Sequence, residues 1–346
     1  MKLSKTFNEK DKILLEKIIT DLKSKNKNES AFSLKPNSIA EINTFENLDT
    51  LKYLISRYKY EIYPKTKELD VYPPLIQIEP SSICNFRCTI CNPSASSMWE
   101  KAPMQVTDNK PTNTYMLDGL EDLDLITISG GEPFIMPEYE GDFFEGRSAK
   151  LFTMATNNSV FPKKEFFDFV DRCENVLIYL SLDGVGEVGE FCRKGLKIKR
   201  FENNLNKWKK WFDQSKFERN GNPDYKLRPP YLTGLRIMFV MQNYNVFNVF
   251  ESMKWAEEHD IILDLRNCYS PEKLNVAYLP DTIKEDIMKT QFYNDVHKEF
   301  VDKILNSGTY DKNRVEEFIE YTKYLMVLDE IPEQSLRIYK KCLDII

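Results

Sequence analysis

The sequence contains only two histidines, no excess of basic residues and no long apolar run. The formal net charge is -6, from 48 lysines and arginines against 54 aspartates and glutamates, so no general field attracts nucleic acid or an anionic membrane. No segment has the uninterrupted apolar core of a signal peptide or the length of a spanning helix. We therefore expect a soluble cytoplasmic protein with neither a membrane nor nucleic acid as its partner.

Disulfide bonds are not expected either, because the seven cysteines are an odd number and three of them cluster in CNFRCTIC, residues 84–91. Cys84, Cys88 and Cys91 form a CxxxCxxC array. Three thiolates with no fourth thiol or imidazole nearby are what a cubane iron–sulfur cluster with one open iron requires. The alternatives are a structural zinc ion, which usually takes four ligands, and three buried structural cysteines, which polar neighbours such as Arg87 argue against.

The spacing of these cysteines and the residues around them resemble the radical S-adenosylmethionine (SAM) superfamily. The resemblance implies that Cys84, Cys88 and Cys91 ligate one [4Fe–4S] cluster. It also implies that the open iron is chelated by the amino and carboxylate groups of SAM.

Two further motifs are similar to parts of the same superfamily. SGGEPF, residues 129–134, places two glycines that allow close approach to a ligand before a glutamate that accepts from an ammonium group; alone, it would be an ordinary turn. LSLDG, residues 180–184, with Arg193 or Arg200 after it, resembles enzymes of the SPASM and Twitch type. By this resemblance, the residues expected at SAM are Gly130, Gly131, Glu132, Asn157, Ser181, Asp183, Arg193 and Asn243, the last beside the adenine.

Strands and helices alternate along the chain, which predicts an α/β fold. We expect strands at 75–78, 123–128, 150–159, 175–184, 235–243 and 261–268. We expect helices at 92–101, 163–173, 201–212 and 245–259. Six such units correspond to the partial, open (β/α)6 barrel that the resemblance implies, with the cysteine loop at the carboxyl end of the first strand.

Three regions follow from this pattern. Residues 1–70 are a helical extension with helices at 9–24 and 48–60, residues 71–268 are the barrel, and residues 269–346 are a helical, Twitch-like cap with helices near 281–306 and 313–329. The polar connection 213–231 is long enough to form a lid. The helical spacing of Trp208 and Trp211 favours core tryptophans over a surface that stacks on bases.

The resemblance also implies a reaction. A reduced cluster passes one electron to SAM, and the resulting 5′-deoxyadenosyl radical abstracts a hydrogen atom from the substrate. An external donor such as flavodoxin or ferredoxin would supply the electron. SPASM and Twitch relatives mostly modify peptides or proteins, so we expect a peptide or protein residue as the substrate. A small metabolite, such as a nucleotide or sugar, is the second choice, and a non-catalytic iron–sulfur or zinc module is the third.

The remaining cysteines lead to two expectations. Downstream of the fourth strand, Cys192, Cys268 and Cys342 are widely scattered, so we predict a single cluster. Cys268 closes the sixth predicted strand, where its thiol could return a hydrogen atom to a substrate radical. The alternative is a small buried hydrophobic residue, which is the commoner role of a free cysteine.

Overall fold

The computed structural model describes residues 75–79, 81–99, 122–139, 141–217, 219, 234–290, 292 and 295–345. The helices predicted at 9–24 and 48–60 lie outside the described residues, as does most of the connection 213–231.

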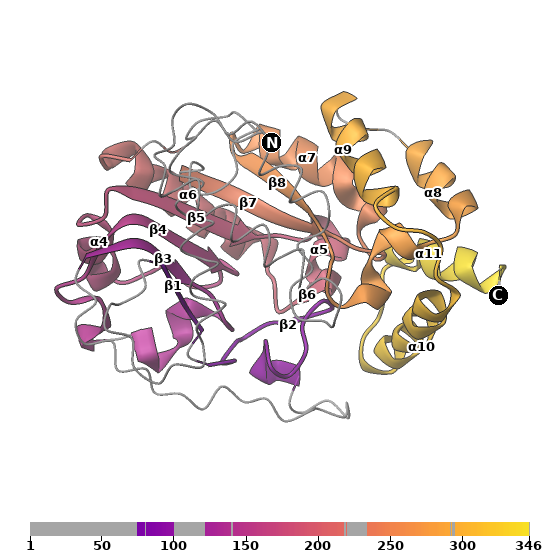
Figure 1. Cartoon of the computed structure of the whole chain (residues 1–346), viewed down its shortest axis with the longest axis horizontal. Coiled ribbons are helices and arrows are strands. Elements are labelled where there is room, and N and C mark those ends of the chain that lie inside the picture. The colour runs from indigo at the N-terminus through magenta and orange to yellow at the C-terminus, as the bar shows by residue number, and fades with distance from the viewer. Residues whose placement is uncertain are drawn as a thin grey trace, which may run out of the picture.

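Six strands form one parallel sheet in the order β1–β3–β4–β5–β7–β8 (Figure 1). Their bounds are β1 (Leu75–Ile78), β3 (Asp122–Ile128), β4 (Ser148–Thr156), β5 (Asn175–Ser181), β7 (Gly234–Met241) and β8 (Ile262–Asn267). These are the six strands expected from the sequence, so the α/β prediction is confirmed, although the strands predicted to become β4, β5, β7 and β8 end one to three residues earlier than expected. The described edge strands β1 and β8 are not paired with each other, and closure towards a barrel stays a prediction.

A second, smaller sheet joins the cysteine loop to the segment after β5. β2 (Arg87–Cys88) pairs antiparallel with β6 (Arg193–Lys194), so that Cys88 lies opposite Arg193. Because all six strands of the main sheet are parallel, their carboxyl ends share one edge. The cysteine loop, the GGE turn and the LSLDG turn all follow strands at that edge.

Eight described α-helices accompany the sheets. They are α4 (Lys164–Val170), α5 (Gly186–Cys192), α6 (Ile198–Gln214), α7 (Val249–Glu258), α8 (Asp281–Met288), α9 (Asp295–Leu305), α10 (Lys312–Leu328) and α11 (Glu333–Leu343). Short 3-10 turns are η1 (Ser97–Trp99), η2 (Pro133–Ile135), η3 (Pro137–Tyr139), η4 (Gly141–Phe144), η5 (Val246–Asn248), η6 (Glu272–Leu274) and η7 (Val276–Tyr278). In the described part of the chain, no helix is both long and apolar enough to cross a membrane.

Two helix predictions are wrong. The helix expected at 92–101 is only η1 up to Trp99, where the described stretch ends. There the Ser97 amide donates to the distant Ser82 carbonyl (2.7 Å) instead of to the carbonyl four residues before it, as a helix would require. The helix expected at 281–306 is divided into α8 and α9, and the Thr290 hydroxyl bonds to the Ile287 carbonyl (2.6 Å) just after α8.

The hydrophobic core is asymmetric about the main sheet. One face packs against the helices in a large cluster, whereas among the described residues the other carries a small group of buried residues, namely Leu125, Leu151, Leu177 and Tyr179. Trp208 of α6 is fully buried in the large cluster beside the rings of Phe161 and Phe166. The prediction of a core role is therefore confirmed for Trp208, and Trp211 is half-buried beside it.

The helices α8 to α11 gather beyond one end of the sheet, at the right of Figure 1. This confirms a helical C-terminal part, while its likeness to a Twitch domain stays a prediction. α10 reaches the cysteine loop, because the Tyr321 hydroxyl donates to the Thr89 carbonyl (2.9 Å). The C-terminal helices therefore support the loop directly.

Candidate functional site

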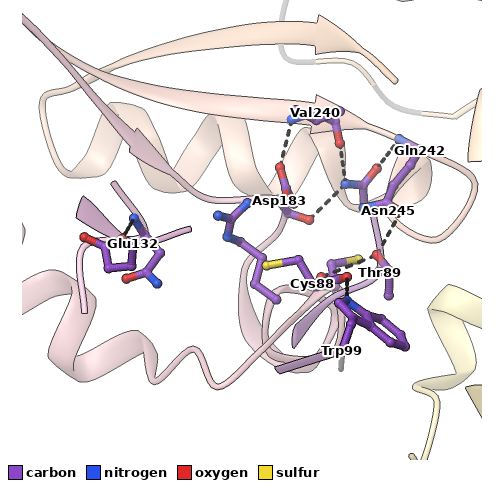
Figure 2. Close-up of polar contacts among 11 residues, drawn as sticks. Cys88, Thr89, Trp99, Glu132, Asp183, Val240, Gln242 and Asn245 are labelled. Atoms are coloured by element: carbon purple, nitrogen blue, oxygen red, sulfur yellow. Dashed lines mark hydrogen bonds and ion pairs between the residues drawn. The ribbon is translucent and has the colours of Figure 1, made fainter. Parts of the chain in front are cut away.

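The cysteine loop, residues 84–91, is held by backbone contacts on both sides. The Thr89 amide donates to the carbonyl of Cys192 (2.9 Å), next to the pairing of Cys88 with Arg193. On the other side, the Trp99 indole N–H donates to the Cys88 carbonyl (3.0 Å; Figure 2). A loop that would otherwise be mobile is thus fixed between η1 and β6.

The three thiols of the loop share one environment. All are free cysteines, with Cys88 buried and Cys84 and Cys91 half-buried. The Cys88 thiol donates a hydrogen bond to the Cys91 sulfur, which lowers the pKa of Cys91. Burial raises the pKa of Cys84, and the nearby Cys88 sulfur raises it further. The three sulfurs are therefore close enough to act on one another electrostatically.

No three histidine, cysteine, aspartate or glutamate side chains meet closely enough to hold a single metal ion, in the part of the chain that the structure describes. A cubane cluster with one open iron takes three cysteine thiolates, one on each of its other irons. Cys84, Cys88 and Cys91 supply that number of thiols.

The two glycines of the GGE turn lie against the start of the cysteine loop. The amide of Gly131 donates to the carbonyl of Ser81 (3.2 Å) and the amide of Glu132 to that of Ile83 (2.8 Å). A Cβ atom on Gly131 would lie 2.0 Å from the Ile83 oxygen, and Gly130 has a φ of +115°. The sequence interpretation assigned the glycines to ligand approach, whereas the close approach seen in the structure is to this chain's own backbone.

The Glu132 carboxylate joins the ends of β3 and β4. It is fully buried and accepts from the Thr156 hydroxyl (2.6 Å), the Asn157 amide (2.6 Å) and the Phe134 amide (3.3 Å). Burial raises the pKa of Glu132 to about 7, although these hydrogen bonds act in the opposite direction. The Asn157 side chain then donates to Asn85 (2.9 Å), so the same network reaches the cysteine loop.

A buried ion pair lies on the other side of the loop. Asp183 binds the Arg193 guanidinium (2.6 Å) and accepts from the Val240 amide (2.9 Å), while its carbonyl accepts from Asn245 (3.0 Å; Figure 2). The Arg193 pKa is raised by Cys88 and Asp183, despite burial that would lower it. Its buried Nε has no partner among the described residues. Arg193 can therefore donate to one more anionic group beside Cys88.

Among the described residues, the other predicted residues make no hydrogen bond to this group. Ser181 ends β5, and Asn243 follows β7 with its side-chain oxygen buried and without a partner among the described residues. Cys268 follows β8, and its buried thiol donates to a backbone carbonyl of the next turn (3.5 Å). The alternative arginine, Arg200, is exposed on α6. The structure thus groups the cysteines with Glu132, Asn157, Asp183 and Arg193.

Several contacts of the loop could not be found from sequence motifs. The Thr89 hydroxyl donates to the Gln242 side chain (2.9 Å), and the Thr89 carbonyl accepts from Tyr321. Thr89 lies within the cysteine motif, and Gln242 lies beside Asn243. Their positions next to predicted site residues could therefore have marked both as candidates. Nothing near Tyr321 in the sequence points to the loop, because α10 reaches it only through the fold.

Comparison with known proteins gives one family match. Residues 78–217 match the model of the Radical SAM superfamily, a segment that runs from the end of β1 to just past α6. No curated protein matches the chain.

Solved structures are similar at low identity. Native anSMEcpe with bound AdoMet is 18% identical, with a TM-score of 0.41, over 68% of this chain and 63% of that one. SuiB of Streptococcus suis bound to its precursor peptide SuiA is 15% identical, with a TM-score of 0.39, over 91% of this chain and 63% of that one. This chain thus spans slightly less than two thirds of the length of either protein.

Replacing Gly131 with alanine tests the contact between the two motifs. The added Cβ would clash with the Ile83 backbone, so we expect Gly131→Ala to lower the free energy of unfolding by about 1–3 kcal/mol in urea titrations. Gly146→Ala is the control, because Gly146 has a φ of +68° but nothing within 4 Å of its added Cβ. Equal losses in both variants would contradict the close approach.

The reactivity of the cysteines tests their burial. Burial raises the pKa of Cys173 to about 11, that of Cys268 and Cys342 to about 12, and that of Cys192 well above its usual value. Because alkylation requires the thiolate, we expect iodoacetamide at pH 8 to spare these four in the folded, metal-free protein and to modify Cys91, the loop cysteine whose pKa is lowered. Reaction at the four should rise as the pH approaches 11. Mass spectrometry would locate the adducts, with denatured protein as the control; rapid labelling of the four at pH 8 would contradict the assignment.

Proposed function

We propose that this chain is a radical SAM enzyme that uses one [4Fe–4S] cluster to cleave SAM and abstracts a hydrogen atom from a peptide or protein residue. The observation that carries the proposal is the backbone contact between the GGE turn and the residue just before the cysteine loop, through Gly131 and Ile83. This contact lies inside the segment that matches the Radical SAM superfamily.

The residues around the loop suit the proposed cofactors. Cys84, Cys88 and Cys91 supply three thiolates for three iron atoms. Glu132 supplies an oxygen acceptor for the SAM ammonium group, and the unpartnered Nε of Arg193 supplies a donor for its carboxylate. When bound, the cluster and SAM supply the 5′-deoxyadenosyl radical that takes the hydrogen atom.

The chain's own contribution is to fix and tune these groups. The Asn157 side chain and the Phe86 amide both donate to the Cys84 sulfur (3.8 and 3.4 Å). Hydrogen bonds to a ligating sulfur and solvent exposure are among the factors that set a cluster's reduction potential. Ser181, Asp183 and Asn243 complete the proposed SAM site at the ends of β5 and β7. An external flavodoxin or ferredoxin would supply the electron.

The peptide substrate rests on the resemblance of LSLDG to SPASM and Twitch enzymes. The single cluster rests on the cysteines outside the loop, because Cys173, Cys192, Cys268 and Cys342 are buried and scattered along the chain. In this proposal, residues 1–70 form a helical extension, residues 71–268 form the partial barrel and residues 269–346 form a Twitch-like cap.

Anaerobic reconstitution with iron and sulfide, followed by dithionite and SAM, tests the proposal. We expect about four irons per chain and formation of 5′-deoxyadenosine, both lost in Cys88→Ala. Cys173→Ala is the control, because this buried cysteine follows α4, away from the cysteine loop, and the variant should keep iron and activity. About eight irons per chain would contradict a single cluster, and bound zinc without nucleoside would contradict the enzyme.

Cys268 is proposed as a hydrogen donor to the substrate radical: its S–H bond would break as the new bond to hydrogen forms on the substrate. The external electron donor would then reduce the sulfur radical left on Cys268, which would take up a proton from solvent. Burial raises its pKa to about 12, so the thiol keeps the hydrogen atom that the role requires. With the substrate in hand, we expect Cys268→Ala to form less product for each 5′-deoxyadenosine released, and wild-type product made in D2O to carry deuterium. Cys342→Ala, at another buried thiol, is the control. Product at normal yield from Cys268→Ala would show that the donor role is wrong.

A further inference from the structure

A polar cluster lies on the side of the main sheet that faces away from the large core. Along β8, Leu263 and Leu265 belong to the large core, so the alternating Asp264 and Arg266 point to the opposite face. Tyr179 of β5 lies on that face too, in the small apolar group. Parallel sheets usually cover both faces with apolar residues, so charged residues here are unusual.

The three side chains are bonded to one another. The Tyr179 hydroxyl donates to Asp264 Oδ2 (3.2 Å), and Arg266 Nη2 donates both to that oxygen (2.9 Å) and to the Tyr179 hydroxyl (3.1 Å). Burial and the charge of Asp264 raise the pKa of Tyr179 to about 12, so the hydroxyl keeps its proton. The trio is therefore a fixed arrangement at neutral pH.

These bonds leave part of each charged group available. All of them use one nitrogen of Arg266 and one oxygen of Asp264. No hydrogen bond within the described part of the chain uses Asp264 Oδ1 or the other guanidinium nitrogens. The Arg266 side chain is 42% exposed, so these donors can be reached from outside.

A free acceptor beside free donors matches an amide group. The amide oxygen would accept from Arg266 and the amide N–H would donate to Asp264 Oδ1. A carboxylate or phosphate would be repelled by Asp264, and an ammonium group by Arg266. An amide satisfies both side chains without adding a charge.

The polar cluster of Tyr179, Asp264 and Arg266 lies close to the proposed SAM site. Tyr179 precedes Ser181 by two residues on β5, a rise of about 7 Å along the strand. On β7, the residue in register with Arg266 is Val240, whose amide donates to Asp183. A group bound by Asp264 and Arg266 would therefore lie further from the carboxyl ends of the strands than the residues proposed to bind SAM.

We propose that Asp264 and Arg266 bind an amide group of the substrate, with Tyr179 as a positioning residue, and that this amide is a peptide bond. The inference rests on the proposed function and deepens it, because it names the chemical group by which the substrate is recognised.

The test measures binding of a pool of N-acetylated, C-amidated tripeptides to the reconstituted full chain with SAM, by saturation-transfer NMR. We expect about tenfold weaker binding to Arg266→Met, which loses the donors. We expect Asp264→Asn to weaken tripeptide binding similarly. If the asparagine oxygen keeps the hydrogen bonds from Tyr179 and Arg266, its NH2 group faces the substrate N–H, and two donors then meet. Arg219→Met is the matched control, since Arg219 pairs with Asp213 and Asp260 and its carbonyl accepts from Leu235 near the start of β7.

A second probe needs no variant that might fold poorly. In ester analogues of the tripeptides, an oxygen replaces the amide N–H, so they should bind the wild-type chain more weakly than the amides do. Asp264→Asn should not weaken their binding further. Equal binding of amides and esters would overturn the proposal. Equal binding of the tripeptides to wild type and Arg266→Met would also overturn it. So would the absence of binding by both the tripeptides and uridine at several millimolar.

Uridine, whose base contains a cyclic amide, separates a peptide from a small metabolite. If uridine binds in place of the tripeptides and is lost in the same variants, the amide site stands and the peptide assignment is overturned. Iron content and 5′-deoxyadenosine are measured on the same preparations. Their absence, with amide binding that depends on Arg266, would count against the proposed function alone.

Discussion

The candidate site depends on the close backbone contact between the cysteine loop and the GGE turn. Gly131 can lie against the Ile83 carbonyl only because it has no Cβ, and this contact brings Glu132 next to the loop that carries the thiols. The two motifs follow neighbouring strands, β1 and β3, so the parallel sheet already places them at one edge. The glycine then reduces their separation to direct contact.

The Asp183–Arg193 ion pair fixes the opposite side of the cysteine loop. A buried carboxylate is tolerated when it is fully bonded, and Asp183 accepts from both Arg193 and the Val240 amide. Removing either partner would leave a buried charge, which costs far more than the pair contributes. Since Arg193 also pairs through its backbone with Cys88, the position of the loop is tied to the ends of β5 and β7.

Features that depend on neighbouring residues could be predicted from the sequence. Contacts between residues far apart in the chain could not. Strand alternation, the cysteine array and the GGE turn are local patterns, and the six predicted strands are present in the sheet. The helix predicted at 92–101 is not formed because the Ser97 amide bonds to the distant Ser82 carbonyl, a contact that helix propensity does not reveal. The support of Thr89 by Tyr321, and the meeting of Tyr179 with Asp264, exist only once the chain has folded.

Side chains alternate between the two faces of the sheet along each strand, so one face can pack against the core while the other carries polar groups. On β5, Ile178 and Leu180 enter the large core, while Tyr179 faces the other way and joins the small group. On β8, the same alternation separates Leu263 and Leu265 from Asp264 and Arg266. One face therefore supplies the packing that holds the strand ends in place. The other can carry polar groups at low cost to stability, because the large core does not depend on it. The substrate site that we propose lies on this second face, apart from the packing that holds the strand ends.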